Sequence, residues 1–243
     1  MPEQSRSDEL RRLERTEDRV IVYSQDYPAG YHVPQHCHQR SQFLCAFSGV
    51  ILVETDRGHF MTPPGYALLI PPRLEHSVAM LTDVTTNSVY ISATERPFFG
   101  ERPVIVGMTE LMRNLIVEAV ALGARQHPNA RKLGLVKELL VEEVLELEER
   151  PLALPFPADR RLSELCRKFL DQPSPYARID DWAADLGMSR RTFTRFFRDE
   201  MNVSFVAWRQ HASVLSCLPK LAEGEAVTTV ALEAGYQSAA AFT

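Results

Sequence analysis

The hydrophobic pattern of this chain changes its period part-way along, and that change restricts the folds open to it. Residues 20–91 consist of short runs rich in valine, isoleucine, phenylalanine and tyrosine, separated by glycine, proline and aspartate. Such runs predict closely spaced strands, with a hairpin at Asp56–Gly58. From Thr109 onward, apolar residues recur at helical spacing instead. The sequence therefore predicts an α+β chain, in which a sandwich or small barrel is followed by helices.

Two amphipathic helices are expected directly after the strands. Their apolar positions are Leu111, Leu115, Ala119 and Leu122 in the first helix, and Val136, Leu139, Leu140, Val144 and Leu147 in the second. Residues 123–130 separate the two helices, so they predict a helical hairpin. The hairpin either covers the barrel or provides a dimer contact, and the sequence leaves both roles open.

A length of 243 residues suits two ordinary domains. Pro151, Pro155 and Pro157 cannot continue a helix, so they mark a linker, and everything after Asp159 has helical patterning. The predicted segments are a charged N-terminal stretch (1–19), a barrel domain (20–105), a helical hairpin (106–150), a linker (151–158) and an all-helical domain (159–243).

Composition excludes several classes of protein. The net charge of -5 gives no whole-chain signal for nucleic acid, so any such signal has to be local. The charged N-terminus excludes an ordinary secretory signal, and no apolar run is long enough for a bilayer. The four cysteines contain no CxxC pair, which favours reduced thiols. We therefore expect a cytoplasmic protein without a membrane partner.

A local positive signal is present between Ser189 and Arg198, a stretch that holds four arginines and no acidic residue. Ser189 is a good N-cap, and a helix that starts after it collects Phe193, Phe196 and Phe197 on one face. Arg191, Arg195 and Arg198 share the opposite face. Gly187 permits a sharp turn before this helix, so the pattern predicts a helix-turn-helix whose second helix enters the major groove. The alternative is an ordinary solvated helix face.

The same pattern returns near the end of the chain. Residues 183–189 align with residues 231–238, with one extra residue in the second turn, and Phe242 takes the place of Phe193. One long helix, at residues 204–221, joins the two units, although Pro219 interrupts it. Two units joined in this way could reach successive major grooves.

The region 159–243 resembles the AraC family of transcriptional regulators, most specifically at residues 185–210 and 226–242. The resemblance implies that Arg191, Thr194 and Arg195 face bases, whereas Arg190 and Arg198 meet phosphates. Ser238 and Ala239 begin the second recognition helix. The chain ends at Thr243, after the first turn of that helix, and is poor in arginine after Arg209. We therefore expect weak operator affinity.

Histidines form a second group of candidate site residues. His36 and His38 alternate by two and would point to one face of a strand; Gln42 follows them, and His76 comes later. Three imidazoles at one site could hold zinc, nickel or iron, or could simply be hydrogen-bonded within the barrel. The spacings resemble the two cupin motifs, with Gln42 in place of the usual glutamate and Arg73 in place of a glycine.

The domain order resembles AraC-type regulators with a cupin sensor. This resemblance implies a ligand-responsive regulator that binds promoter DNA, takes a small effector in the barrel, forms a homodimer and contacts RNA polymerase, and that is not an enzyme. The alternative is a cupin metalloenzyme of the oxygenase or isomerase type with a helical appendage. A weaker alternative is an interaction protein that does not bind DNA.

Overall fold

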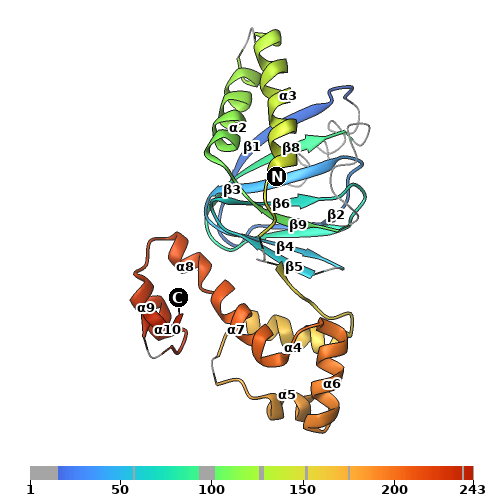
Figure 1. Cartoon of the computed structure of the whole chain (residues 1–243), viewed down its shortest axis with the longest axis vertical. Coiled ribbons are helices and arrows are strands. Elements are labelled where there is room, and N and C mark those ends of the chain that lie inside the picture. The colour runs from blue at the N-terminus through green and yellow to red at the C-terminus, as the bar shows by residue number, and fades with distance from the viewer. Residues whose placement is uncertain are drawn as a thin grey trace. The chain divides into compact units, whose positions relative to one another are not determined.

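The computed structural model describes residues 16–56, 58–92, 102–125, 129–150, 153–174, 176–236 and 238–242 (Figure 1). The chain divides into two compact units. The first unit comprises Met1–Val53 and Thr62–Pro151, and the second comprises Glu54–Met61 and Leu152–Thr243. No helix in the described ranges is long and apolar enough to cross a bilayer.

The strands form two five-stranded sheets with orders β1-β8-β3-β6-β9 and β10-β5-β4-β7-β2. The predicted α+β organisation is confirmed, and the strands build a β-sandwich. The strands are β1 (Val20–Tyr27), β2 (His32–His36), β3 (Ser41–Ser48), β4 (Ile51–Thr55), β5 (Gly58–Thr62), β6 (Tyr66–Ile70), β7 (His76–Met80), β8 (Val84–Ile91), β9 (Val104–Gly107) and β10 (Ala153–Leu154).

The first sheet presents opposite faces to two different environments because its side chains alternate along each strand. In the antiparallel pair β3–β8, Phe43 lies opposite Val89, and both belong to the hydrophobic core. The neighbouring pair, Gln42 and Tyr90, points to the other face. The sheet therefore has one apolar face and one face that carries buried polar groups.

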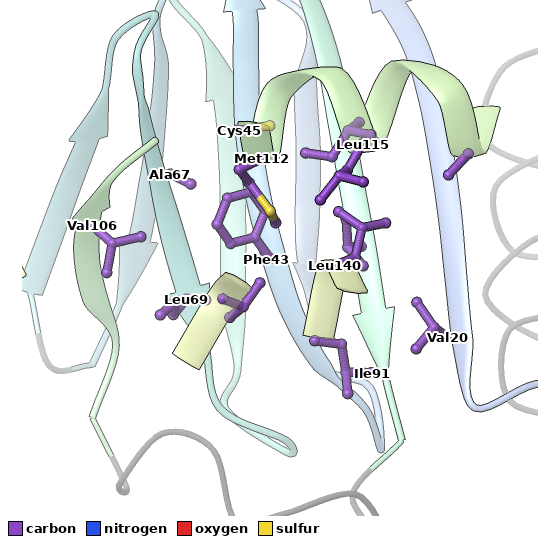
Figure 2. Packing of buried hydrophobic residues seen from close by; sticks show 14 residues of the cluster. Val20, Phe43, Cys45, Ala67, Leu69, Ile91, Val106, Met112, Leu115 and Leu140 are labelled. Atoms are coloured by element: carbon purple, nitrogen blue, oxygen red, sulfur yellow. The ribbon is translucent and has the colours of Figure 1, made fainter. Parts of the chain in front are cut away.

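The predicted helical hairpin covers the apolar face. It consists of α2 (Glu110–Gly123), capped by Thr109, and α3 (Ala130–Glu146), capped by Asn129. Figure 2 shows Met112 and Leu115 of α2 directed toward Phe43, with Leu140 of α3 beside them. The covering role of the hairpin is therefore confirmed.

Two of the predicted core positions in this hairpin are wrong. Leu111 is 47% exposed and Leu139 is 46% exposed. Each residue lies at the edge of the buried face of its helix. A helix that packs on a sheet buries a narrower face than the spacing of its apolar residues suggests. Leu115, Ala119, Leu122, Leu140 and Val144 are buried as expected.

The helical part of the second unit is built around a cluster of aromatic rings. The ring centroids of neighbouring members lie no more than 6.0 Å apart. The contacts join Phe169 to Trp182, Trp182 to Phe205, Phe205 to Phe197, and Phe197 to Trp208. Its helices are α4 (Arg160–Asp171), α5 (Ile179–Asp185), α6 (Arg190–Met201), α7 (Phe205–Leu215), α8 (Leu218–Ala222), α9 (Val227–Glu233) and α10 (Ala239–Phe242).

The helix predicted at residues 204–221 is interrupted, as its Pro219 indicates. The chain forms α7 and then α8, with a break at Ser216 and Cys217. Pro219 lies in the first turn of α8, where its missing N–H is not needed, but it could not continue α7 without losing a hydrogen bond.

The second unit also contains the hairpin segment Glu54–Met61. Strand β5 pairs with β10 through Leu154 and His59. The His59 ring stacks on Phe156 with centroids 3.4 Å apart, and its Nε2 lies 3.3 Å from the Glu54 carboxylate, which Arg167 approaches to 3.7 Å. Burial, and secondarily the positive charge of Arg167, lower the pKa of His59 to about 3. This histidine is therefore neutral at physiological pH.

Candidate functional site

The helix α6 begins where its sequence predicts. The Ser189 side chain accepts a hydrogen bond from the backbone N–H of Thr192 at 3.2 Å, which caps the helix. The helix ends at Met201, and Asn202 takes the left-handed conformation with φ of 55°.

One face of α6 is fixed in the aromatic cluster. Phe193 and Phe197 are completely buried, and each contacts Phe205 at ring distances below 6 Å. Phe196, predicted on the same face, is only half-buried, because it lies at the margin of that face. The helix therefore cannot rotate about its axis without losing its aromatic contacts.

The opposite side of α6 is exposed and positively charged. We call this surface the basic ridge; all its side chains are exposed, and its members are Arg190, Arg191, Thr194, Arg195 and Arg198. Offsets of three and four residues keep them along one side of the helix. The predicted separation of charge from aromatic residues is confirmed.

Two contacts organise the beginning of the ridge. Arg190 lies 3.3 Å from Asp180 of α5, and its side chain is 68% exposed. The Thr194 hydroxyl donates to the Arg190 carbonyl at 2.8 Å. Because an exposed ion pair is worth little, Arg190 can exchange Asp180 for a phosphate at small cost.

The turn between α5 and α6 uses a glycine in the left-handed region. Gly187 has φ of 67°; its N–H donates to Ala184 at 2.9 Å, and the N–H of Met188 donates to Ala183 at 2.8 Å. These two bonds satisfy carbonyls at the end of α5.

The second helix-turn-helix, formed by α9 and α10, repeats this turn. Gly235 has φ of 81° and its N–H donates to Leu232 at 3.0 Å, while Tyr236 donates to Ala231 at 2.9 Å. Ser238, which is exposed, and Ala239, which is half-buried, stand at the start of α10, as the sequence repeat predicts.

In the first unit, the structure brings the predicted histidines together. His36 of β2 and His76 of β7 are cross-strand partners with ring centroids 4.3 Å apart. His38 lies 5.2 Å from His76 and 5.3 Å from Tyr90. His38 and His76 are buried, and His36 is half-buried. We call these three histidines with Gln42 the histidine cluster.

Backbone carbonyls fix the tautomer of each ring. Nδ1 of His36 lies 2.9 Å from the Pro34 carbonyl, Nδ1 of His38 lies 2.5 Å from that of Arg40, and Nδ1 of His76 lies 2.9 Å from that of Leu74. A carbonyl only accepts, so Nδ1 carries the proton in each ring. In its neutral form each imidazole therefore presents Nε2 as an acceptor.

Gln42 completes the cluster. Its side chain contacts the hydroxyls of Ser88 at 2.9 Å and Tyr90 at 3.1 Å, and its other amide atom lies 3.0 Å from His38 Nε2. The two ends of an amide are interchangeable in such assignments. With its NH₂ toward His38 and its oxygen toward the hydroxyls, the contacts of the Gln42 amide with His38, Ser88 and Tyr90 are all hydrogen bonds.

The histidine cluster is also the predicted metal site. Among the described residues, no group of three or more histidine, cysteine, aspartate or glutamate side chains is arranged to hold a metal ion. The Nδ1 contacts with backbone carbonyls leave each ring in the tautomer in which Nε2 can bind a metal.

Arg73, which replaces the usual glycine of the cupin motif, has φ of 64°. This left-handed conformation is unfavourable for arginine. Its N–H donates to the His38 carbonyl at 2.8 Å, and its guanidinium donates to Gln39 at 2.9 Å. Arg73 therefore ties the turn before β7 to the segment that carries His38.

Sequence reasoning missed Arg40. Its buried guanidinium donates to the carbonyls of Thr16 at 2.8 Å and Asp18 at 2.7 Å. Burial lowers the pKa of Arg40, partly offset by the Asp18 carboxylate. Ser88 and Tyr90 were also missed, although their alternation with Val89 along β8 could have indicated them.

The cysteines form no disulfide. Cys37, between two histidines of the cluster, is exposed, whereas Cys45, Cys166 and Cys217 are buried. Burial raises the pKa of each of these three thiols.

Two known domain families match the chain in the order that the fold suggests. An AraC-like ligand-binding domain matches residues 19–104, and a helix-turn-helix domain matches residues 182–243. The chain belongs to the AraC family of transcriptional regulators. This AraC-type protein therefore binds DNA through its helical domain and has a ligand-binding domain; it is a regulator and not an enzyme, so the metalloenzyme alternative is wrong.

A full-length relative supports this assignment. The chain is 28% identical over 214 residues to the HTH-type transcriptional regulator NimR of Escherichia coli, a match that covers 86% of this chain and 76% of NimR.

Among solved structures, the chain is similar to ToxT K231A of Vibrio cholerae, at 10% identity and a TM-score of 0.38, covering 93% of this chain and 92% of that one. A cupin superfamily protein of Desulfitobacterium hafniense, at 16% identity and a TM-score of 0.30, covers 32% of this chain and 71% of that one.

Proposed function

We propose that this AraC-type regulator recognises a specific promoter sequence with the basic ridge and responds to a small effector bound at the histidine cluster. The observation that carries the proposal is the basic ridge itself, which stands exposed on a helix whose other face is fixed by completely buried Phe193 and Phe197. A helix held this firmly can present side chains to a major groove in a fixed register.

The ridge residues have two kinds of role. Arg191, Thr194 and Arg195 face base edges, where an arginine that bonds a guanine contributes about 1–3 kcal/mol of discrimination. Arg190 and Arg198 contact phosphates, which add affinity without sequence information. Ser238 and Ala239 take the corresponding place in the second unit.

Binding-site selection from random duplex DNA tests this proposal. We expect one enriched motif whose affinity falls in Arg191→Ala and Arg195→Ala, while the Arg198→Ala variant binds all sequences more weakly. Each measurement is made at fixed, stated salt, because phosphate contacts make affinity salt-dependent. Failure to enrich any motif, with the helical domain folded, would refute sequence-specific recognition.

The effector site is proposed at the histidine cluster because it gathers buried polar side chains from both sheets, Gln42 of β3 in the first sheet and His76 of β7 in the second. Gln42, His38 and His76 are all less than 5% exposed, and buried polar groups of this kind orient a small polar ligand. A screen of small polar metabolites by thermal shift tests the site, with Gln42→Leu as the variant that should lose the response.

A divalent metal at the cluster remains a prediction. Three imidazoles and an amide would suit zinc, nickel or iron once the rings had moved. Titration with each metal, followed by elemental analysis, tests it, and His76→Ala should abolish stoichiometric binding. Metal content below stoichiometry in the unaltered protein would exclude the metal.

We also propose that the regulator is a homodimer joined through α3. Leu135 and Leu139 are 57% and 46% exposed and line a groove of about 1050 Å³ beside Glu17–Val20. They lie four residues apart on one side of the helix, so they form an unpartnered apolar strip.

The charges of α3 favour an antiparallel copy as the partner. Basic residues occupy its first half and acidic residues its second half, namely Arg131, Lys132 and Lys137, then Glu138, Glu142, Glu143 and Glu146. This order opposes the dipole of the helix itself, but in an antiparallel pair it places opposite charges side by side. Lys137 also contacts Asp18 at 3.5 Å.

Sedimentation equilibrium tests the dimer. The Leu135→Glu/Leu139→Glu variant should be a monomer, whereas Val117→Glu, at a 50% exposed position of α2, should leave the mass unchanged. A monomeric unaltered protein at micromolar concentration would refute the interface.

A regulator of this kind has to act where the chromosome and RNA polymerase are, so we propose the cytoplasm as its location and polymerase as a partner at the promoter. A promoter–reporter assay with and without the gene distinguishes activation from repression.

A further inference from the structure

The turn before α5 exposes an aromatic side chain that the fold does not require. Tyr176 is 81% exposed, the highest value among the exposed large hydrophobic residues of the described chain. Arg178, two residues later, is also exposed. Neither side chain contributes to the aromatic core, so packing does not explain their presence here.

The backbone of this turn is nevertheless held firmly. Arg209, half-buried in α7, donates to the Ala177 carbonyl at 2.7 Å. The Tyr176 N–H donates to the Ser174 hydroxyl at 3.3 Å, and the Ala177 N–H donates to the Ser174 carbonyl at 3.2 Å. An arginine from another helix thus fixes the position from which Tyr176 and Arg178 project.

The turn lies at the same end of the helix-turn-helix as the start of α6. The Arg178 carbonyl accepts the first bond of α5, from the Asp181 N–H at 3.1 Å. Asp180, in that first turn, pairs with Arg190 at 3.3 Å. Figure 1 shows α5 and α6 side by side. Arg178 therefore stands two residues before Asp180, which is paired with Arg190 of the basic ridge.

The charges around the turn are mixed. Asp180 is engaged by Arg190, while the exposed Asp181 is an acidic neighbour that reduces the local positive potential. The other polar groups of the turn are the guanidinium of Arg178 and the phenol hydroxyl of Tyr176, which are both hydrogen-bond donors. Such donors suit phosphate oxygens, which carry charge but no sequence information.

We propose that Tyr176 and Arg178 form a second DNA contact, which binds the phosphate backbone flanking the groove entered by α6, with Arg209 as the positioning residue. The inference rests on the proposed function of the basic ridge and adds residues outside it. These contacts would hold the DNA backbone near the start of α6. They would thereby fix which bases the side chains of the basic ridge reach.

Fluorescence anisotropy with a labelled duplex of random sequence tests the clamp, because phosphate contacts operate on any sequence. Arg178→Ala should weaken binding and reduce the salt slope of log K by about one. Arg178→Lys should keep the slope. Tyr176→Phe, which loses only the hydroxyl, should weaken binding roughly tenfold without changing the slope, as expected for a hydrogen bond to a charged group. Arg102→Ala, 63% exposed in the first unit, is the matched control.

Arg209 is tested by a readout that a simple loss of affinity would not provide. In Arg209→Ala, amide hydrogen exchange should rise at residues 176–178 while Ser189–Met201 stays protected. Unchanged exchange at residues 176–178 would exclude the positioning role.

The outcomes separate the two hypotheses. If the unaltered protein binds the duplex and the Arg178 and Tyr176 variants match it in affinity and slope, the clamp is wrong and the ridge stands. If the unaltered protein binds no duplex at any salt, the proposed function itself fails.

Discussion

The two helix-turn-helix units use the same turn to display different surfaces. Gly187 and Gly235 are both left-handed, and the carbonyls they satisfy occupy equivalent places in α5 and α9. The first turn leads to the arginines of the basic ridge, whereas the second leads to the small side chains of α10. The comparison teaches that the turn fixes where a recognition helix starts, while its chemistry depends on residues that do not shape the turn.

The cores behind the turns differ as well. Trp182 belongs to the aromatic cluster behind the first helix-turn-helix, whereas the equivalent buried position in the second helix-turn-helix is Val230. The first unit is therefore held by large rings and the second by small aliphatic groups.

Removal of the buried Phe193 ring should have the largest effect on the difference between the two cores. Phe193→Ala is expected to lower the free energy of unfolding of the helical domain by about 3–5 kcal/mol, because it empties a completely buried site. Val230→Ala should cost about 2 kcal/mol. Urea unfolding followed by tryptophan fluorescence measures both, since Trp182 and Trp208 lie in this unit. Equal losses in the free energy of unfolding would mean that the two cores contribute equally to stability.

Replacement of the base-facing residues should sharpen the difference in surface chemistry. Arg191→Ala and Arg195→Ala are each expected to reduce binding to the selected operator by about 1–3 kcal/mol. Ser238→Ala, at the equivalent place in the second unit, should lose less than either arginine variant. Anisotropy titrations at constant salt compare them, and a larger loss for Ser238→Ala would reverse the roles of the two units.

Acid should weaken the support that the hairpin segment gives to the helical domain. His59 has a pKa of about 3 when folded, so below its unfolded pKa of about 6.5 the unfolded chain binds more protons. The contribution of neutral His59 to the free energy of unfolding is therefore fully present above pH 6.5. It falls as the pH drops toward 3, by roughly 2 kcal/mol at pH 5. Urea midpoints at pH 7 and pH 5 measure the loss, and His59→Phe should reduce it. A variant with the same pH dependence would assign the effect to other groups.

Alteration of the turn itself should have the smallest effect. Gly187→Ala is expected to cost about 1–2 kcal/mol, for conformational reasons alone, because a Cβ there would meet nothing within 4 Å. Gly187→Asn should cost less, since asparagine tolerates this conformation better. Tryptophan-monitored unfolding compares the two, and a loss above that of Phe193→Ala would show that backbone strain outweighs ring packing.

Local patterns predicted the helix-turn-helix well because the information is local. The position of Ser189, the phenylalanine spacing and Gly187 each fix a cap, a face or a turn within a few residues. The prediction that His36 and His38 share one face of a strand is wrong, because β2 ends at His36 and His38 joins the cluster from the segment after it.

What the sequence did not reveal depends on contacts between distant segments. Arg40 reaches carbonyls more than twenty residues away, and Arg209 holds a turn more than thirty residues away. The exposure of Leu111 and Leu139 depends on how each helix is rotated against the sheet. The pairing of β5 with β10 likewise joins segments with no shared motif.

The uneven burial of the four thiols makes the protein easy to label at one place. A maleimide dye at neutral pH would react with Cys37 and leave the three shielded thiols, whose pKa values are raised, largely untouched. The fluorophore would then sit beside the imidazoles of the histidine cluster, where its emission could report the arrival of a ligand before that ligand has been identified.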